Sequence, residues 1–174
     1  MSEGATSENR LSREAYLSAM RGVAASVAVV TTDGPAGRHG ATVTAFSSVS
    51  ADPPTVLVCL HGASRIAEQV AANGQYCLNI LQQEESQTAD RFAGRHDDVV
   101  KDRFAGIPCC GKAGMPPMLE GAISLCCRVS GTMQAGSHKI FVAEVDAIFG
   151  GASEPLTYLD GVYRKLAPRN EYSI

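Results

Sequence analysis

The sequence lacks the features of a nucleic-acid-binding or membrane-spanning protein. It has no run of Lys and Arg residues, and its formal net charge is −3 with a pI near 5.8. Nucleic acids and anionic membrane surfaces attract basic proteins, so neither is expected as a partner. No apolar run approaches the roughly 18 residues that span a bilayer, and MSEGATSENR at the start lacks the apolar core of a signal peptide. We therefore expect a cytoplasmic protein that acts on a small molecule.

Four common catalytic signatures are absent as well. The chain has no G-x-G-x-x-G after a strand, no G-x-x-x-x-G-K-[ST], no G-x-S-x-G and no H-E-x-x-H. These absences argue against a Rossmann dinucleotide site, a P-loop, a hydrolase nucleophile elbow and a zincin centre. The six cysteines include two adjacent pairs, but neither has the C-x-x-C spacing that closes two thiolates on one metal ion. We expect no metal site, and we interpret the cysteines in apolar runs as reduced core thiols.

Composition and length predict one globular domain. Of the 174 residues, 45% are hydrophobic and 19% are charged, which is enough for a substantial core. We predict a single domain over residues 12–168, between a disordered segment at 1–11 and a tail at 169–174.

The secondary-structure pattern is mainly β with flanking helices. Stretches rich in β-branched and apolar residues, punctuated by Gly, Pro and Asp, predict a closed or sandwiched sheet. The predicted strands are 26–32, 41–50, 55–60, 76–81, 122–133 and 139–149. Helices are predicted after Ser12, from the helical spacing of Tyr16, Leu17, Met20 and Val23, over 64–74, and in the segment that ends at Gly94.

One predicted strand carries an unusual number of hydroxyl groups. In GATVTAFSSVSADPP, Thr42 and Thr44 would share one face of a strand over 41–50, and Val43 and Ala45 the other. Such a strand is either an edge strand with its polar face in water or the wall of a groove for a flat polar ring. Ser64 leaves a similar choice open, because a Ser that starts a helix after a strand is either a simple N-cap or part of a phosphate site.

These blocks together resemble the short-chain flavin reductase family. The resemblance rests on ATVTAFSSVSADPPTVLVCL, a Ser at the start of a helix, QYCLNIL, RFAG, GSHKIF and PLTYLDGVYRKL, in this order over about residues 14–166. It implies an FMN-binding split β-barrel that forms a homodimer. It also implies an NAD(P)H:flavin oxidoreductase that transfers a hydride from NADH or NADPH to FMN or FAD and supplies reduced flavin to a partner monooxygenase or another electron acceptor.

The resemblance also implies which residues bind the flavin. The expected cofactor-binding residues are Thr42, Val43, Thr44, Ala45, Ser47, Ser48, Ser50, Cys59, Leu60, His61, Ser64, Arg65 and Phe92. The four residues from Thr42 to Ala45 are expected beside the ring, the three serines of 47–50 nearer the ribityl chain and phosphate, and Phe92 along the flavin tail.

His138 is the expected catalytic residue. A histidine that opens a strand after Gly-Ser is typically a solvated turn residue. The resemblance instead implies that His138 lies over the flavin edge near the nicotinamide. The chain departs from the family pattern at two positions, with Ser137 where Asp is common and His61 where Asn is common. His39 and His96 lie in polar sequence and are predicted to be solvated.

Several functions remain compatible with the sequence. The same flavin site would serve a flavoprotein that reduces a bound metal complex such as a cobalt corrinoid, a noncatalytic flavin-binding module, or a scaffold that has lost its flavin. The intact TVTAFSSVS block argues against the last of these, because a lost site has no need of its hydroxyl groups. FMN versus FAD and NADH versus NADPH stay open.

Overall fold

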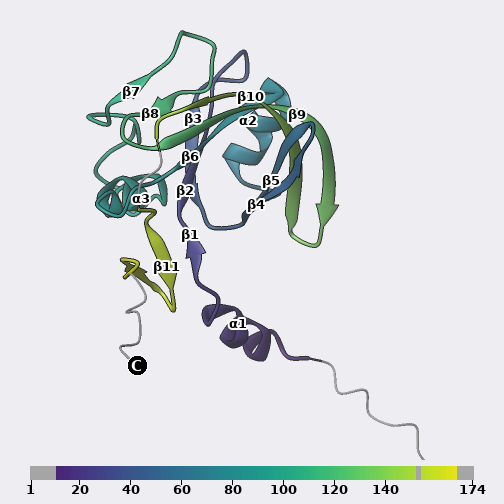
Figure 1. Ribbon diagram of the computed structural model, residues 1–174, viewed down its shortest axis with the longest axis vertical. Coiled ribbons are helices and arrows are strands. Elements are labelled where there is room, and N and C mark those ends of the chain that lie inside the picture. Colours follow the sequence, from purple (N-terminus) through teal and green to yellow (C-terminus); the bar gives the residue numbers. More distant parts are fainter. Residues whose placement is uncertain (1–10, 152–153, 168–174) are drawn as a thin grey trace, which may run out of the picture.

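A computed structural model describes residues 11–151 and 154–167 of the chain (Figure 1). The helices are α1 (Arg13–Arg21), α2 (Arg65–Asn73) and α3 (Ser86–Phe92). The strands are β1 (Ala25–Ser26), β2 (Ala28–Thr32), β3 (His39–Val43), β4 (Phe46–Ala51), β5 (Pro54–His61), β6 (Gln75–Ile80), β7 (Cys109–Cys110), β8 (Met118–Leu119), β9 (Ile123–Ala135), β10 (His138–Phe149), β11 (Thr157–Leu159) and β12 (Val162–Arg164). The disordered segment and tail predicted at 1–11 and 169–174 lie outside the described residues, apart from Leu11, and the domain bounds of 12–168 stay a prediction.

Seven strands form the main sheet, in the order β3-β2-β6-β9-β10-β5-β4, with every neighbouring pair antiparallel. Its two edge strands, β3 and β4, are consecutive in the chain and are joined only by Thr44 and Ala45. A two-residue connection spans less than about 11 Å, so the sheet must curl until its edges nearly meet. The backbone N–H of Cys59 on β5 donates to the carbonyl of Ala45 at 2.8 Å, which holds the connection in place. The mainly β prediction of a split barrel with flanking helices is confirmed, and the sheet is curled but not closed.

The prediction of one continuous strand over 41–50 is wrong. β3 ends at Val43 and β4 begins at Phe46. Thr44 and Ala45 carry the chain from one edge of the sheet to the other, so residues before and after them do not share one alternating pattern of faces. The other predicted strands and the three helices are confirmed, with shifts of a few residues at their ends and residue 27 separating β1 from β2.

Two apolar clusters form the core. The larger one packs the apolar side of α2, including Ile66 and Val70, against side chains of the sheet such as Val30, Leu78 and Phe141. The smaller one joins α3 to the loop after it and to the short strands. In this cluster the rings of Phe92 and Phe104 meet edge to face with centroids 5.0 Å apart. α2 and α3 therefore both pack against β2 and β3 and fix the position of the β3 edge.

The helix ends follow the predicted capping residues. Ser12 accepts a hydrogen bond from Ala15 N at 3.1 Å, and Ser64 accepts one from Ala67 N at 3.4 Å. Gly74 ends α2 with a φ of 70°, a left-handed conformation that glycine adopts without strain.

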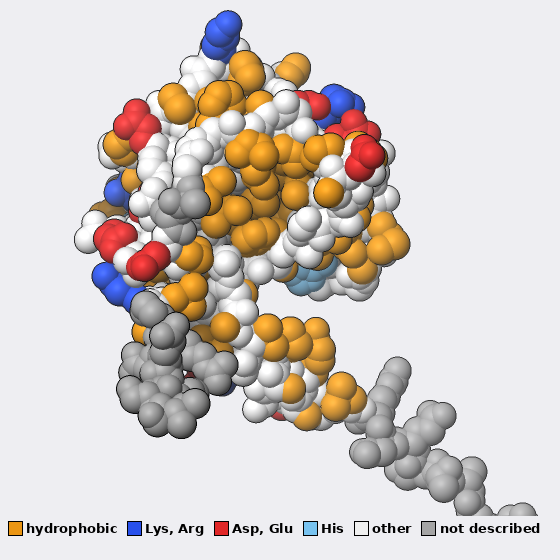
Figure 2. Space-filling model, viewed as in Figure 1, with side chains coloured by type: hydrophobic (Ala, Val, Ile, Leu, Met, Phe, Trp, Pro, Cys, Tyr) orange, Lys and Arg blue, Asp and Glu red, His pale blue; other side chains and the backbone are white. Residues whose placement is uncertain are grey.

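α1 differs from the other helices because it buries none of its side chains. Figures 1 and 2 show it projecting from the body of the molecule with apolar side chains on its surface. Its apolar residues Tyr16, Leu17 and Met20, which the sequence pattern predicted, are between 39% and 53% exposed. No helix within the described residues is long and apolar enough to cross a membrane.

The six cysteines are all free thiols. Cys77 and Cys127 are buried on β6 and β9, and Cys59 and Cys126 are partly buried on β5 and β9.

A buried polar network ties the sheet to the loop at β8. The side chain of Asn79 on β6 is fully buried. Its amide nitrogen donates to Val29 O at 3.1 Å, and its oxygen accepts from Leu119 N at 2.9 Å and from Ser124 Oγ at 2.7 Å. Asn79 therefore serves the fold, because its side chain is committed to partners within the protein.

We predict that Asn79→Ala lowers the free energy of unfolding by about 2–4 kcal/mol, because it leaves several buried polar groups without partners. Urea unfolding followed by circular dichroism measures the change. Ser130→Ala, which removes one exposed hydroxyl bonded to Val142 O, is the control and should cost less than about 0.5 kcal/mol. Equal stability of the two variants would contradict the assigned role.

Candidate functional site

A groove of about 250 Å³ lies between the β3 edge of the sheet and the end of β5. Segments far apart in the sequence meet there: β3 with the connection after it, the end of β5, the start of α2 and the first residue of β10. The lining residues are Ala41, Thr42, Val43, Thr44, Ala45, Cys59, Leu60, His61, Ser64, Ile66 and His138. Eight of the thirteen predicted cofactor-binding residues, together with the predicted catalytic histidine, therefore come together.

The groove presents neutral polar groups above an apolar floor. β3 is an edge strand, so half of its backbone N–H and C=O groups point away from β2 and have no strand partner. Val43, Leu60 and Ile66 are buried and supply apolar surface. Small side chains at Ala41 and Ala45 allow a flat ligand to approach the backbone. This donor set fits a planar ring with polar edges, such as the flavin isoalloxazine.

Hydrogen bonds fix the walls of the groove. Thr42 Oγ1 donates to Ala89 O of α3 at 2.6 Å, which holds β3 against that helix. Ser64 Oγ donates to His61 O at 2.6 Å while it caps α2. Gly62 N donates to Ser137 O at 2.8 Å, which joins the turn after β5 to the turn before β10. The start of α2 and the start of β10 are thus held beside each other.

Two histidines lie at this end of the groove. His61 and His138 are directly opposite each other in the pairing of β5 with β10. Their rings are 5.5 Å apart between centroids and meet edge to face at 79°. Ser137 Oγ lies 3.1 Å from Nδ1 of His138, where a carboxylate is common in the family. A neutral hydroxyl can therefore orient the imidazole of His138 without adding a negative charge.

The remaining predicted contacts do not line the groove. Ser47 and Ser48 are exposed on β4, and Ser50 is occupied by a hydrogen bond from its hydroxyl to Asp52 O at 3.0 Å. Arg65 faces a neighbouring cavity.

The expected placement of Phe92 along the flavin tail does not agree with the structure. Its ring is fully buried and packs beneath β3 at Gly40, where an added Cβ would lie 2.6 Å from the ring. Its core packing leaves the side chain of Phe92 no surface for a ligand.

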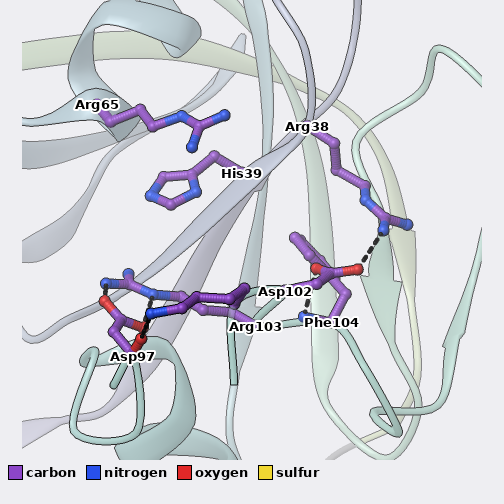
Figure 3. Close-up of a pocket in the computed structure, with 8 residues that line it drawn as sticks. Arg38, His39, Arg65, Asp97, Asp102, Arg103 and Phe104 are labelled. Atoms are coloured by element: carbon purple, nitrogen blue, oxygen red, sulfur yellow. Dashed lines mark hydrogen bonds and ion pairs between the residues drawn. The ribbon is translucent and has the colours of Figure 1, made fainter. Parts of the chain in front are cut away.

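A second cavity of about 580 Å³ contains Arg65 (Figure 3). It is lined by Arg38, His39, Arg65, Asp97, Lys101, Asp102, Arg103 and Phe104. The prediction that His39 is a solvated loop residue is wrong, because it begins β3 and is half-buried in this cavity. Burial, together with the positive charges of Arg103 and Arg65, lowers the pKa of His39 to about 4.

Sequence reasoning missed this cavity because its residues come from three separate segments. Arg103 connects two of them: it binds Asp97 through two nitrogens, at 2.6 and 2.9 Å, and donates to Gly40 O and Phe92 O at 3.0 and 2.9 Å. The hydrogen bond from Arg103 lowers the pKa of Asp97. The mixed charges of RHDDVVKDR were the only signal in the sequence, and that run alone is typical of a solvated loop.

The curled open sheet with a neutral groove at its split places the chain in the class of flavin-binding split barrels. A family model described as "flavin reductase like domain" matches residues 20–167. The chain belongs to this family, as the sequence blocks predicted. A curated relative, FMN reductase (NADH) RutF from Ancylobacter novellus, is 39% identical over 166 residues, which cover 94% of this chain and 91% of the relative.

Two solved structures extend the comparison. The NADH:FAD oxidoreductase SgcE6 of Streptomyces globisporus C-1027, in complex with NAD and FAD fragments, has a TM-score of 0.82 and 25% identity, covering 98% of this chain and all of that one. BorF, the flavin reductase component of a bacterial two-component tryptophan halogenase, has a TM-score of 0.78 and 26% identity, covering 91% of this chain and all of the other.

Proposed function

We propose that the protein is an NAD(P)H-dependent flavin reductase that binds the flavin ring in the groove between β3 and β5. The observation that supports the proposal most is the groove itself. The unpaired edge of β3, an apolar floor and the start of α2 line it, beside His61 and His138, which are paired across β5 and β10. Its membership of the flavin reductase family and the names of its relatives support the same activity. FMN is the flavin that the curated relative's name indicates, with NADH as the donor.

The residues of the groove bind and orient, and none of them needs to act as a general base. A flavin held there would supply the redox chemistry, which is hydride transfer from a nicotinamide and delivery of the electrons to an acceptor. The edge of β3 offers hydrogen bonds to the polar side of the ring, and Val43, Leu60 and Ile66 keep water from its face. Ser64 and Arg65 at the start of α2 receive the phosphate, because unpaired helix N–H groups and the guanidinium favour an anion.

The electron acceptor that fits best is a partner enzyme that uses the reduced flavin. Solved neighbours include a reductase component of a two-component halogenase, which supports the supply of reduced flavin to a separate oxygenase. Free thiols at all six cysteines agree with a cytoplasmic location, where thiols stay reduced.

A homodimer belongs to the same proposal. The apolar side chains of α1 stay partly exposed within the described part of the chain, and a second copy would cover them. A cavity between α1 and the short β11–β12 sheet is lined by Thr44 and Ala45, which also line the groove. A partner seated on α1 would therefore lie beside the flavin ring.

Anaerobic stopped-flow absorbance tests the activity. The protein is mixed with FMN, FAD or riboflavin and then with NADH or NADPH, and the oxidised flavin band is followed. We expect the band to bleach rapidly. A flavin that binds but stays oxidised in excess NADH and NADPH would show a noncatalytic binding module and overturn the proposal. Rapid bleaching followed by transfer of the electrons only to a metal complex, such as a cobalt corrinoid, would identify that alternative.

His138 is proposed to position the nicotinamide over the flavin. We predict that His138→Ala slows flavin reduction by NADH about tenfold or more, while the flavin Kd changes less than about threefold, because the ring is needed for alignment of the donor. Stopped-flow reduction and fluorescence titration measure the two quantities. His96→Ala, in the loop after α3, is the matched control. Loss of flavin affinity without a change in reduction rate would remove His138 from this role.

Ser64 is proposed to contact the phosphate in addition to capping α2. Ser64→Ala and Ser12→Ala each remove an N-cap and should each cost about 1 kcal/mol of stability at most. Only Ser64→Ala should also weaken FMN binding, by about 1–2 kcal/mol, since its hydroxyl proton, which points to His61 O in the free protein, is proposed to turn to the phosphate when FMN binds. Titration of FMN fluorescence compares the variants, and equal affinity in both would contradict the phosphate assignment.

A further inference from the structure

We propose that Cys77 on β6 and Cys126 on β9 form a reversible disulfide when hydrogen peroxide oxidises the protein. Cys126 is the thiol that the peroxide oxidises first, and Cys77 is the thiol that closes the bond. Neither cysteine lines the groove, so this modification goes beyond the flavin reductase activity and is independent of it.

The two cysteines face each other across the sheet. In the antiparallel pairing of β6 with β9, Cys77 is directly opposite Cys126. Residues in direct opposition have Cα atoms about 4.5–5.5 Å apart, and a disulfide joins Cα atoms about 4.4–6.8 Å apart. Opposed residues also project from the same face of the sheet. The bond can therefore close without a change in the register of the two strands.

The neighbouring thiol of Cys127 projects from the opposite face. It is buried in the larger apolar cluster together with Tyr76, its partner in the same strand pair. Successive residues of a strand point to opposite faces, so Cys127 cannot reach Cys77 while the strands stay paired. The other three cysteines lie on β5 and β7, which pair with neither β6 nor β9. Within the described residues, Cys77 and Cys126 are thus the one pair of cysteines that the sheet places opposite each other.

The loop between β7 and β8 covers Cys77, whose exposed fraction is 0%. Thr31, which is opposite Cys77 on β2, donates from Oγ1 to Pro117 O at 2.5 Å. Gln75, two residues before Cys77 on the same face, donates from Nε2 to Gly114 O at 2.8 Å. These bonds hold the loop against the sheet on both sides of Cys77, so this thiol has no surface that a peroxide in solution could reach.

Cys126, by contrast, is only partly buried and lines a cavity of about 340 Å³. The other walls of this cavity include Met115 and Pro116 of the same loop and Ala147 and Phe149 on β10. A peroxide is far smaller than this space. The cavity therefore admits the oxidant to Cys126, while Cys77 stays covered beside it.

The two thiols also differ in their ionisation. A hydrogen bond from the S–H of Cys77 lowers the pKa of Cys126, against the opposing effects of burial and of the Asp146 carboxylate. The same hydrogen bond and burial raise the pKa of Cys77. Asn79 Oδ1 lies 3.5 Å from the sulfur of Cys77 but already accepts two shorter bonds, which leaves the thiol proton to Cys126. Because the thiolate is the nucleophile, Cys126 is the residue that attacks the peroxide.

The oxidation takes two steps. The thiolate of Cys126 attacks one oxygen of hydrogen peroxide, the S–O bond forms as the O–O bond breaks, and the departing hydroxide takes up one proton to leave as water. The sulfur of Cys77 then attacks the sulfur of Cys126. The S–S bond forms as the S–O bond breaks, and the hydroxyl group leaves as a second water with the proton of Cys77. In sum, two thiols lose two electrons and one peroxide is reduced to two waters.

Peptide mapping of the full-length protein tests the disulfide. The folded protein is treated with one equivalent of hydrogen peroxide, its remaining thiols are blocked with N-ethylmaleimide in denaturant, and it is digested with trypsin without a reductant. Cleavage after Lys and Arg places Cys77 in peptide 66–91 and both Cys126 and Cys127 in peptide 113–128. We expect mass spectrometry to find these two peptides cross-linked, fragmentation to place the bond at Cys126, and dithiothreitol to separate them.

Three variants separate the roles of the thiols. Cys126→Ser should lower the yield of the cross-linked peptides about tenfold or more, because the thiol that meets the peroxide is lost. Cys77→Ser should leave Cys126 as a sulfenic acid that dimedone traps. Cys127→Ala is the matched control, and its yield should stay within about twofold of the wild type, because its side chain lies on the other face. The digest of the wild type decides the proposal even where a variant does not fold.

Several outcomes would overturn the proposal. One is a wild-type protein in which Cys77 and Cys126 both remain free to react with N-ethylmaleimide after the peroxide treatment. Another is a cross-link between Cys77 and Cys127, or one that persists at full yield in Cys126→Ser. Oxidation of the exposed Cys110 with Cys126 left reduced would also contradict it. Failure of the reductase proposal is seen separately, because flavin bleaching by NADH is measured without peroxide.

Discussion

The two-residue connection between β3 and β4 is the constraint on which the rest of the structure depends. Thr44 and Ala45 join the first and last strands of a seven-stranded sheet. An open sheet of that width with its edges apart could not be bridged by so short a segment, so the sheet curls until its edges nearly meet. The curl also brings the β3 edge and the connection after it beside the end of β5, where the groove lies.

An unpaired edge is normally a liability for a β protein, because its N–H and C=O groups attract other strands. Here α2 and α3 pack against β3, and its edge lines the groove together with the connection to β4. The hydroxyl-rich sequence around it now has several explanations. Thr42 fastens the strand to α3, Thr44 belongs to the connection, and the serines after it lie on β4, outside the groove.

The parts of the fold that could be predicted from sequence are those that local chemistry determines. Alternating β-branched residues indicated most strands, and the N-caps at Ser12 and Ser64 and the C′ residue Gly74 marked helix ends to within a residue. The interruption at Thr44 and Ala45 could not be predicted, since both residues suit a strand and only the long-range pairing of β4 with β5 breaks it. Phe92 and His39 were misjudged for the same reason: burial at both depends on the loop at 94–104, which is brought against β3 by Arg103.

The groove is lined mostly by neutral groups and the cavity mostly by charged ones. This difference explains why the resemblance to a family identified the groove but not the cavity. The groove is lined by backbone groups and mostly neutral side chains, and most of its residues fall within 41–66, in blocks on which the resemblance rests. The cavity depends on full charges, and a charge is effective only where other groups hold it in place. Arg103 does this by directing its own hydrogen bonds to Asp97, Gly40 and Phe92, which leaves Arg65 and Lys101 facing the space between them. A neutral, smaller groove and a charged, larger cavity therefore lie at opposite ends of the same strand, β3, from Val43 to His39.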